Sequence, residues 1–341
     1  MADGLSILAV HPGALGDLIL FGHLLKRIEG EKTIVTSKEK GKLLLGLGVV
    51  SRAIDFDALP MHEIFADKQL DKCALPGLLG RHDRLVSCFG TGDRRAELRL
   101  AAACGAEDAA FLPIRPPEGS SAHLLAIWCD MLGLRFGFPD DLTAPSWKVP
   151  SAWRVQAACA LNEAGVDRSG SPCAVIHPGS GGAAKCWPLD KFVDLASRLT
   201  RGAFAATSPG PSGNPQSEIR NPQRLFVLGP AEIDRWDAVE VGSLKRRFPV
   251  LADPPLTTLA GVLAGARLYV GNDSGVSHLA AAVGAPTVAI FGPTRAENFA
   301  PIGPHVRTVS ADRLKQLSVA EVFAACKEMI RSHTFARRHG P

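Results

Sequence analysis

The chain has 341 residues, of which 46% are apolar and 21% charged, with a formal net charge of +4. This composition excludes global disorder, which requires low hydrophobicity together with high net charge, and the small positive excess is far from the basic balance of nucleic-acid binders. The length predicts two domains. Residues 1–150 carry 17 Lys and Arg against 19 Asp and Glu, whereas residues 151–341 carry 21 against 15. The second half is therefore the better candidate for an anionic ligand.

Apolar runs predict a first series of strands and helices in the N-terminal half. Residues 6–10 form a continuous apolar run before His-Pro-Gly, which is typical of a strand buried in a parallel sheet. Apolar residues then recur at helical spacing over 17–28. Further strands are expected at 33–36 and 85–89, helices at 120–133 and 152–164, and an extended connector at 145–151.

A second series follows, with strands expected at 173–177, 225–228, 268–270 and 287–291 and helices at 188–199 and 276–283. Strands that alternate with helices form parallel sheets, so the sequence predicts two doubly wound α/β domains with a cleft between them. Residues 205–223 are rich in Pro, Gly, Ser and Asn and contain Asn-Pro-Gln twice. We expect this segment to be a flexible surface insertion, placed at the sheet edge opposite the ligand-binding edge.

The eight cysteines include no pair at the Cys-x-x-Cys spacing. Reduced, buried thiols in a cytoplasmic protein are the simplest interpretation. The N-terminus lacks the basic region of a signal peptide, and its short apolar run predicts a strand. No stretch of 18 residues is purely apolar, so we expect no membrane-spanning helix.

Three turns that follow predicted strands are rich in glycine and polar residues, at 12–17, 177–182 and 271–275. Such turns lie at the carboxyl ends of parallel strands, where ligands bind, and free helix N–H groups there attract anions. The second turn departs from a phosphate-binding Walker A loop because Ala184 and Cys186 occupy the positions of its second glycine and its Ser/Thr. The first lacks the spacing of a dinucleotide fingerprint.

Taken together, four segments and the opening Pro-Gly-Ala-Leu-Gly-Asp17 resemble glycosyltransferase family 9, the ADP-heptose:lipopolysaccharide heptosyltransferases. The segments are His177-Pro-Gly-Ser-Gly, Lys185-Cys-Trp-Pro188, Val270-Gly-Asn-Asp-Ser-Gly-Val-Ser-His278 and Phe291-Gly-Pro-Thr294. The resemblance covers about residues 5–310, apart from 205–223. It implies a GT-B fold, two Rossmann-like doubly wound domains facing a central cleft. The acceptor domain would span 1–150, the nucleotide-sugar domain 151–317, and 318–341 would be a helix crossing back and a basic tail.

The resemblance assigns roles to individual residues. Asp17 would be the general base, although taken alone its place at a helix start also fits a capping residue. Lys185 would act in catalysis as the cation at the diphosphate, and Glu232 would bind the ribose. Asp273 carries a negative charge that would repel phosphate, so it would cap a helix, hold donor groups or bind sugar hydroxyls. The expected donor-binding residues are Ser180, Gly181, Gly182, Lys185, Glu232, Asp273, Ser274, Gly275 and His278, and the acceptor-binding residues are Gly13, Gly16 and Asp17.

The implied activity is an inverting transfer of a heptose or related sugar from an ADP-sugar to a lipopolysaccharide-core-type acceptor, with no cofactor and no metal. The sequence departs from the family at His11, where arginine is common, and at Cys186. Two alternatives remain open: a nucleotide-sugar epimerase or hydrolase on the same fold, and a non-catalytic nucleotide-sugar-binding protein. An acceptor built on lipid A would bring a cytoplasmic protein to the inner face of the membrane, where the basic stretch 331–338 is a candidate contact. No nucleic-acid partner is expected.

Overall fold

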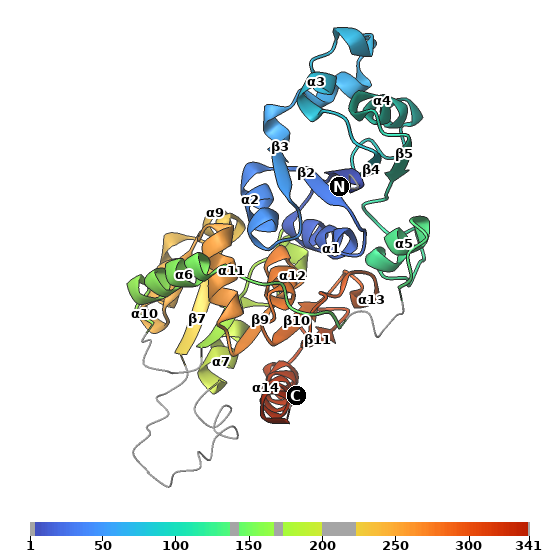
Figure 1. Cartoon of the computed structure of the whole chain (residues 1–341). Helices are drawn as coiled ribbons and strands as arrows, with labels where there is room; N and C mark the ends of the chain where they lie inside the picture. Colours follow the sequence, from blue (N-terminus) through green and yellow to red (C-terminus); the bar gives the residue numbers. More distant parts are fainter. Residues whose placement is uncertain (1–3, 137–142, 167–172, 200–222, 340–341) are drawn as a thin grey trace. The chain divides into compact units, whose positions relative to one another are not determined.

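The computed structural model describes residues 4–136, 143–166, 173–199 and 223–339 (Figure 1). The chain divides into two compact units, Met1–Asp141 and Leu142–Pro341. The sequence placed this division at residue 150. Residues 143–150 belong to the second unit, where the backbone N–H of Trp147 donates to the carbonyl of Ala282 at 2.7 Å.

The N-terminal unit is a five-stranded parallel sheet in the order β3-β2-β1-β4-β5. The central strand β1 is buried along four of its five residues, as its apolar run predicts. The strands are β1 (Ser6–Val10), β2 (Glu31–Thr36), β3 (Arg52–Asp55), β4 (Arg84–Ser87) and β5 (Asp108–Phe111). The helices are α1 (Leu15–Leu25), α2 (Lys38–Gly46), α3 (Leu75–Leu79), α4 (Arg94–Cys104) and α5 (Leu124–Met131), with 3-10 turns η1 (Phe56–Ala58), η2 (Met61–Phe65) and η3 (Leu70–Lys72).

The C-terminal unit is a six-stranded parallel sheet in the order β11-β10-β9-β6-β7-β8. Its strands are β6 (Cys173–His177), β7 (Gln223–Leu228), β8 (Val250–Ala252), β9 (Leu268–Asn272), β10 (Thr287–Phe291) and β11 (Val306–Ser310). Its helices are α6 (Ser151–Glu163), α7 (Leu189–Arg198), α9 (Pro230–Arg235), α10 (Ala238–Arg247), α11 (Leu256–Ala264), α12 (Gly275–Ala282), α13 (Ala296–Phe299) and α14 (Val319–His339), with the 3-10 turn η5 (Ala183–Lys185).

The final helix, α14, completes the core of the C-terminal unit. Val322, Cys326 and Ile330 lie on its buried face, in one apolar cluster with residues of β6, β9 and β10. The helix also contacts α7 and β11. Its expected return to the first domain stays a prediction, and the contacts described for it are those of a C-terminal core helix.

The insertion expected at 205–223 lies outside the described residues up to 222. Described structure resumes with β7 at Gln223. The strand that follows the insertion therefore begins two residues before the strand predicted at 225–228.

The contact between α6 and α11 depends on a glycine. A Cβ added to Gly261 would meet the carbonyl oxygen of Trp153 and would lie 2.8 Å from the Cβ of Ala157. We expect Gly261→Ala to lower the free energy of unfolding by about 1–3 kcal/mol, because the two helices would have to move apart. Urea denaturation followed by tryptophan fluorescence measures this loss.

Gly265→Ala, one turn further along, is the matched control. There the nearest atom to an added Cβ lies 3.6 Å away and the backbone is right-handed, so the control should retain the wild-type stability. Equal losses in the two variants would contradict this account of the packing.

Candidate functional site

The candidate site lies where the C-terminal sheet changes its winding direction. The chain runs outward from β6 to β7 and β8, then crosses to β9 on the other side of β6 and continues to β10 and β11. In open parallel sheets, ligands bind outside the carboxyl ends of the strands at such a switch point. Here the neighbouring ends are His177 of β6 and Gly271 of β9, which pair in register. Two of the three predicted glycine-rich turns begin at this point.

A buried amide joins the two turns. The side chain of Asn272, which is 0% exposed, donates from Nδ2 to the carbonyl of Pro178 at 2.8 Å. Its Oδ1 accepts the backbone N–H of Trp187 at 2.9 Å. Asn272 therefore fixes both ends of the loop that carries Ser180 and Lys185.

Lys185 and Asp273, two of the predicted site residues, form an ion pair. Lys185 Nζ lies 2.7 Å from Asp273 Oδ2, and the side chains are 39% and 8% exposed. The hydroxyl of Ser180 donates to the backbone carbonyl of Asp273 at 2.6 Å. The ammonium neutralises the carboxylate that would otherwise repel a phosphate. The structure thus pairs Asp273 with Lys185, and the role expected for Asp273 toward a bound ligand stays a prediction.

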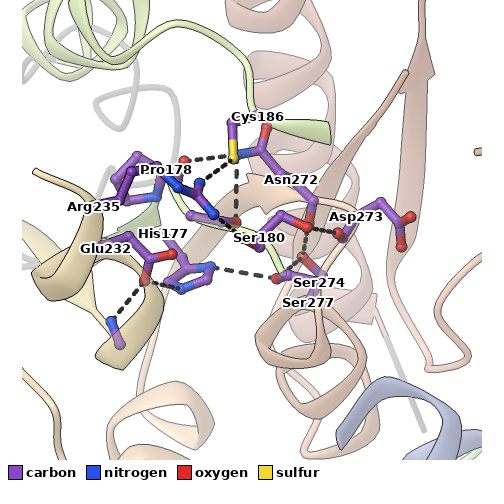
Figure 2. A network of polar contacts seen from close by, with 12 residues as sticks. His177, Pro178, Ser180, Cys186, Glu232, Arg235, Asn272, Asp273, Ser274 and Ser277 are labelled. Atoms are coloured by element: carbon purple, nitrogen blue, oxygen red, sulfur yellow. Dashed lines mark hydrogen bonds and ion pairs between the residues drawn. The ribbon is translucent and has the colours of Figure 1, made fainter. Parts of the chain in front are cut away.

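The start of α12 presents serine hydroxyls to the same site (Figure 2). Ser277 Oγ donates to the carbonyl of Asn272 at 2.5 Å and lies 3.0 Å from the hydroxyl of the buried Tyr269. Ser274 Oγ lies 3.3 Å from His177 Nδ1. These contacts orient the amino end of α12, whose first residue is Gly275, toward the loop after β6.

His278 lies in α12 and is 4% exposed. Its backbone N–H donates to the carbonyl of Ser274 at 3.4 Å. The structure thus places His278 at the end of the first turn of α12, with its side chain buried in the interior of the domain. A contact of its ring with a phosphate stays a prediction.

Glu232 is almost fully buried, at 2% exposure. Its Oε2 accepts the backbone N–H of Gly229 at 2.8 Å and lies 3.4 Å from His177 Nε2. A Cβ added to Gly179 would meet this carboxylate, so only a glycine fits there. Burial alone would raise the pKa of Glu232, but His177, the Gly229 N–H and Arg235 together hold it below its ordinary value.

Arg235 is a candidate residue that the sequence analysis missed. Its guanidinium donates to the carbonyl of Ser180 and to Cys186 Sγ, both at 3.3 Å (Figure 2). Burial raises the pKa of the Cys186 thiol despite the opposing effect of Arg235. The available signal was its position three residues after Glu232 in a short helix. Gly181 and Gly182 lie in the loop between Ser180 and Lys185. A Cβ added to either glycine would stand in open space.

The N-terminal unit repeats the same arrangement around β1 and β4, where its chain changes direction. Asp17 is the third residue of α1 and is half-buried. Burial raises the pKa of Cys88, which directly follows β4, and the negative charge of Asp17 adds to this effect. Asp17 is therefore close enough to the carboxyl end of β4 to influence it electrostatically. Gly13 is exposed and Gly16 half-buried in the same turn. A second residue missed from the sequence, Lys40 of α2, donates to the carbonyl of Gly13 at 2.7 Å.

Within the described residues, nowhere do three or more His, Cys, Asp or Glu side chains gather so as to hold a metal ion. The sequence has one Asp-x-Asp spacing, at 55–57. There Asp55 accepts the backbone N–H of Asp57 at 3.3 Å and caps the turn η1. None of the helices in the described ranges combines the length and apolar character needed to cross a membrane.

The fold is that of a GT-B protein. The structure is similar to E. coli ADP-heptose lipopolysaccharide heptosyltransferase II, with a TM-score of 0.67 at 16% identity, covering 96% of this chain and 99% of that one. It is also similar to the E. coli heptosyltransferase WaaC with ADP, with a TM-score of 0.61 at 18% identity, covering 95% and 99%. The expected fold class, GT-B with two Rossmann-like domains, is confirmed.

The sequence comparisons identify the family of the segment that forms much of this site. Residues 223–325 match the model of glycosyltransferase family 9 (heptosyltransferase) and belong to that family. Lipopolysaccharide heptosyltransferase 1 of Pseudomonas aeruginosa is 32% identical over 125 residues, which are 37% of this chain and 30% of the relative. The match thus spans about a third of the length of the curated relative. For residues 223–325, the family recognised from the motifs is confirmed.

The buried Glu232 gives the site a pH signature. Because its pKa is lower in the folded protein than its ordinary 4.5, its stabilising contribution is complete above that value. The contribution is lost as the pH falls through the lowered value. We expect Glu232→Gln to reduce the free energy of unfolding by about 1–3 kcal/mol at neutral pH, with the difference from wild type shrinking below about pH 4.

Denaturant unfolding between pH 3 and 8 measures this effect. Glu163→Gln, an exposed position in the same domain, serves as the control and should follow the wild-type curve throughout. A Glu232→Gln difference that stays constant across the whole range would contradict the lowered pKa.

Proposed function

We propose that the protein is an inverting glycosyltransferase that moves a heptose or a related sugar from an ADP-sugar onto a lipopolysaccharide-core-type acceptor. The observation that carries the proposal is the position of the family 9 segment. This segment supplies Glu232, Asp273 and the amino end of α12. Ser180 and Lys185, which precede the segment in the sequence, lie at the same edge of the sheet and contact Asp273.

The donor diphosphate would be held at this edge by Lys185, by the hydroxyl of Ser180 and by the first N–H groups of α12. A helix amino end and a lysine both favour negative charge, and Asp273 aims the lysine. The similar heptosyltransferase structures described as complexes with ADP and with ADP-2-deoxy-2-fluoro heptose support an ADP-sugar as the donor. Gly181 and Gly182 leave the open space that a phosphate needs to approach the backbone.

Glu232 would act differently from a freely accessible ribose ligand. It is 2% exposed and already bound to Gly229 and His177, so a ribose would contact it only after a shift of the adjoining turns. As placed, it fixes His177, which in turn contacts Ser274 at the start of α12. The direct ribose contact stays a prediction, and we assign to Glu232 the positioning of this wall of the site.

The chemical step would be a single displacement at the anomeric carbon. Asp17 accepts the proton of the acceptor hydroxyl while that oxygen forms the new bond. The bond from the anomeric carbon to the diphosphate oxygen breaks, and ADP leaves with the electron pair. Lys185 and the N–H groups of α12 stabilise the charge that develops on ADP. This step needs neither a metal ion nor a cofactor, and it inverts the anomeric configuration because the oxygen attacks opposite the leaving group.

A lipid-anchored acceptor would bring the cytoplasmic face of a membrane to the protein. We therefore also propose a cytoplasmic location with peripheral contact at the inner face of the membrane. The basic residues that follow Ile330 would contribute by attraction to anionic lipids.

The role of Asp17 gives a direct test. Asp17→Asn should lower the transfer rate by about 10²–10⁴-fold, since general-base catalysis contributes on that scale, while the affinity for ADP stays within about threefold of wild type. Steady-state transfer assays with ADP-heptose, combined with calorimetric titration of ADP, separate the two effects.

Asp71→Asn, an exposed position in the same domain, is the control and should transfer at the wild-type rate. Near wild-type turnover by Asp17→Asn would remove Asp17 from the role of base. Release of free sugar without an acceptor, at the rate seen with one, would favour a hydrolase.

A further inference from the structure

Lys40 reaches out of its own helix to the start of another. It belongs to α2, but its Nζ donates to the carbonyl of Gly13 at 2.7 Å. Gly13 directly precedes Ala14, the N-cap of α1, and stands four residues before Asp17. The side chain is half-buried, so the ammonium has exchanged part of its hydration for a single carbonyl contact.

The position is electrostatically unfavourable for a cation. The amino end of a helix carries a partial positive charge, which disfavours a second positive charge nearby. In the described parts of the chain, Lys40 forms no ion pair. Burial lowers its pKa, and the more distant carboxylates of Asp57 and Glu39 offset only part of that effect. A bound anion would relieve this repulsion.

His11 supplies an independent observation. Its side chain is 1% exposed, and neither ring nitrogen forms a hydrogen bond with another described residue. The ring edge that carries both nitrogens faces Gly13, because a Cβ there would lie 2.9 Å from Cε1, 3.5 Å from Nδ1 and 3.7 Å from Nε2. Buried polar groups are nearly always satisfied. An unsatisfied ring beside a helix amino end and an ammonium therefore indicates a ligand, which would reach the buried ring after a shift of the exposed turn at Gly13.

The protonation state of His11 is compatible with this arrangement. Burial lowers its pKa to about 4, a contact with its own backbone opposes this effect, and the charge of Lys40 adds to it. At neutral pH the ring therefore provides one N–H donor without adding a third positive charge.

We infer that Lys40, the amino end of α1 and His11 form an anion-binding site on the N-terminal domain that takes a carboxylate or phosphate group of the acceptor. The existence of the site is independent of the proposed function. Only its assignment to the acceptor rests on that function. Gly13 is exposed and lets an anion approach the backbone. An acceptor held there by its acidic group presents a neighbouring hydroxyl to Asp17, one helical turn further on.

The site is tested directly on the full-length protein by NMR. The His11 Cε1–H signal, assigned with His11→Gln, is followed during titration with glucose 6-phosphate, gluconate or glucose. We expect saturable shifts with one or both acidic probes and none with glucose, and binding at least about tenfold weaker in Lys40→Gln. Lys40→Arg should retain binding. Lys42→Gln, at an exposed position of the same helix, should behave as wild type.

The proposal is overturned if neither acidic probe shifts the signal or if Lys40→Gln binds the probes as well as wild type. A response to glucose 6-phosphate alone would assign a phosphate to the site, and a response to gluconate alone would assign a carboxylate.

Transfer kinetics separate this inference from the proposed function. Lys40→Gln should raise the acceptor KM at least about tenfold while kcat and the donor KM change less than about threefold. An unchanged acceptor KM would overturn the assignment to the acceptor and leave the transferase standing. Absence of transfer by the wild-type protein, with the NMR result intact, would overturn the proposed function and leave the anion site standing.

Discussion

The side chain of Asn272 is the contact on which the C-terminal site depends. A buried amide that lost its partners would cost free energy, and Asn272 meets that requirement by bonding the backbone at Pro178 and at Trp187. Those two positions bracket the loop that carries Ser180 and Lys185. The next residue after Asn272 is Asp273, so the same bonds bring the lysine to its carboxylate. The ion pair is a consequence of this backbone registration.

Each buried acid of the site is paired with a basic group. Asp273 has Lys185, and Glu232 has His177 and, at longer range, Arg235. Burying a lone carboxylate would cost several kcal/mol, and the pairing offsets part of that cost before any ligand arrives. A diphosphate entering the site would then meet a lysine that is already oriented. It would also meet a helix amino end at which Ser277 is held by Asn272 and Tyr269 and Ser274 contacts His177. Less reorganisation remains for the reacting complex.

The sequence predicted the interior of both sheets well and their edges poorly. Strands such as β1 and β10 are buried on both faces and are continuous apolar runs, so their pattern is unambiguous. The edge strands β3 and β5 and the short β8 are half-exposed, and their mixed composition carries little strand signal. Helices α4 and α10 were missed as well. Their sequences, RRAELRLAAAC and AVEVGSLKRR, are largely charged on the side away from the core.

The site shows the same limit. Glycine-rich turns marked Ser180, Lys185 and Asp273 because their local chemistry is distinctive. The partners that organise them were not assigned, since Asn272 and Pro178 are 94 residues apart and meet only because β9 lies beside β6. Arg235 and Lys40 were missed for a related reason, because each donates a hydrogen bond to the backbone carbonyl of a turn that is distant in the sequence. A sequence gives the elements of a doubly wound sheet more readily than the order of its strands.

The central claim is that the carboxyl edge of β6 and β9 binds the diphosphate of an adenosine nucleotide through Lys185. Calorimetric titration of wild type and Lys185→Met with ADP, UDP, GDP and dTDP tests it most directly. The account predicts that ADP binds more tightly than the other three and that Lys185→Met weakens ADP binding at least about tenfold, as expected for loss of a charge-assisted hydrogen bond. Equal binding of another nucleoside diphosphate, or an unchanged ADP affinity in Lys185→Met, would contradict it.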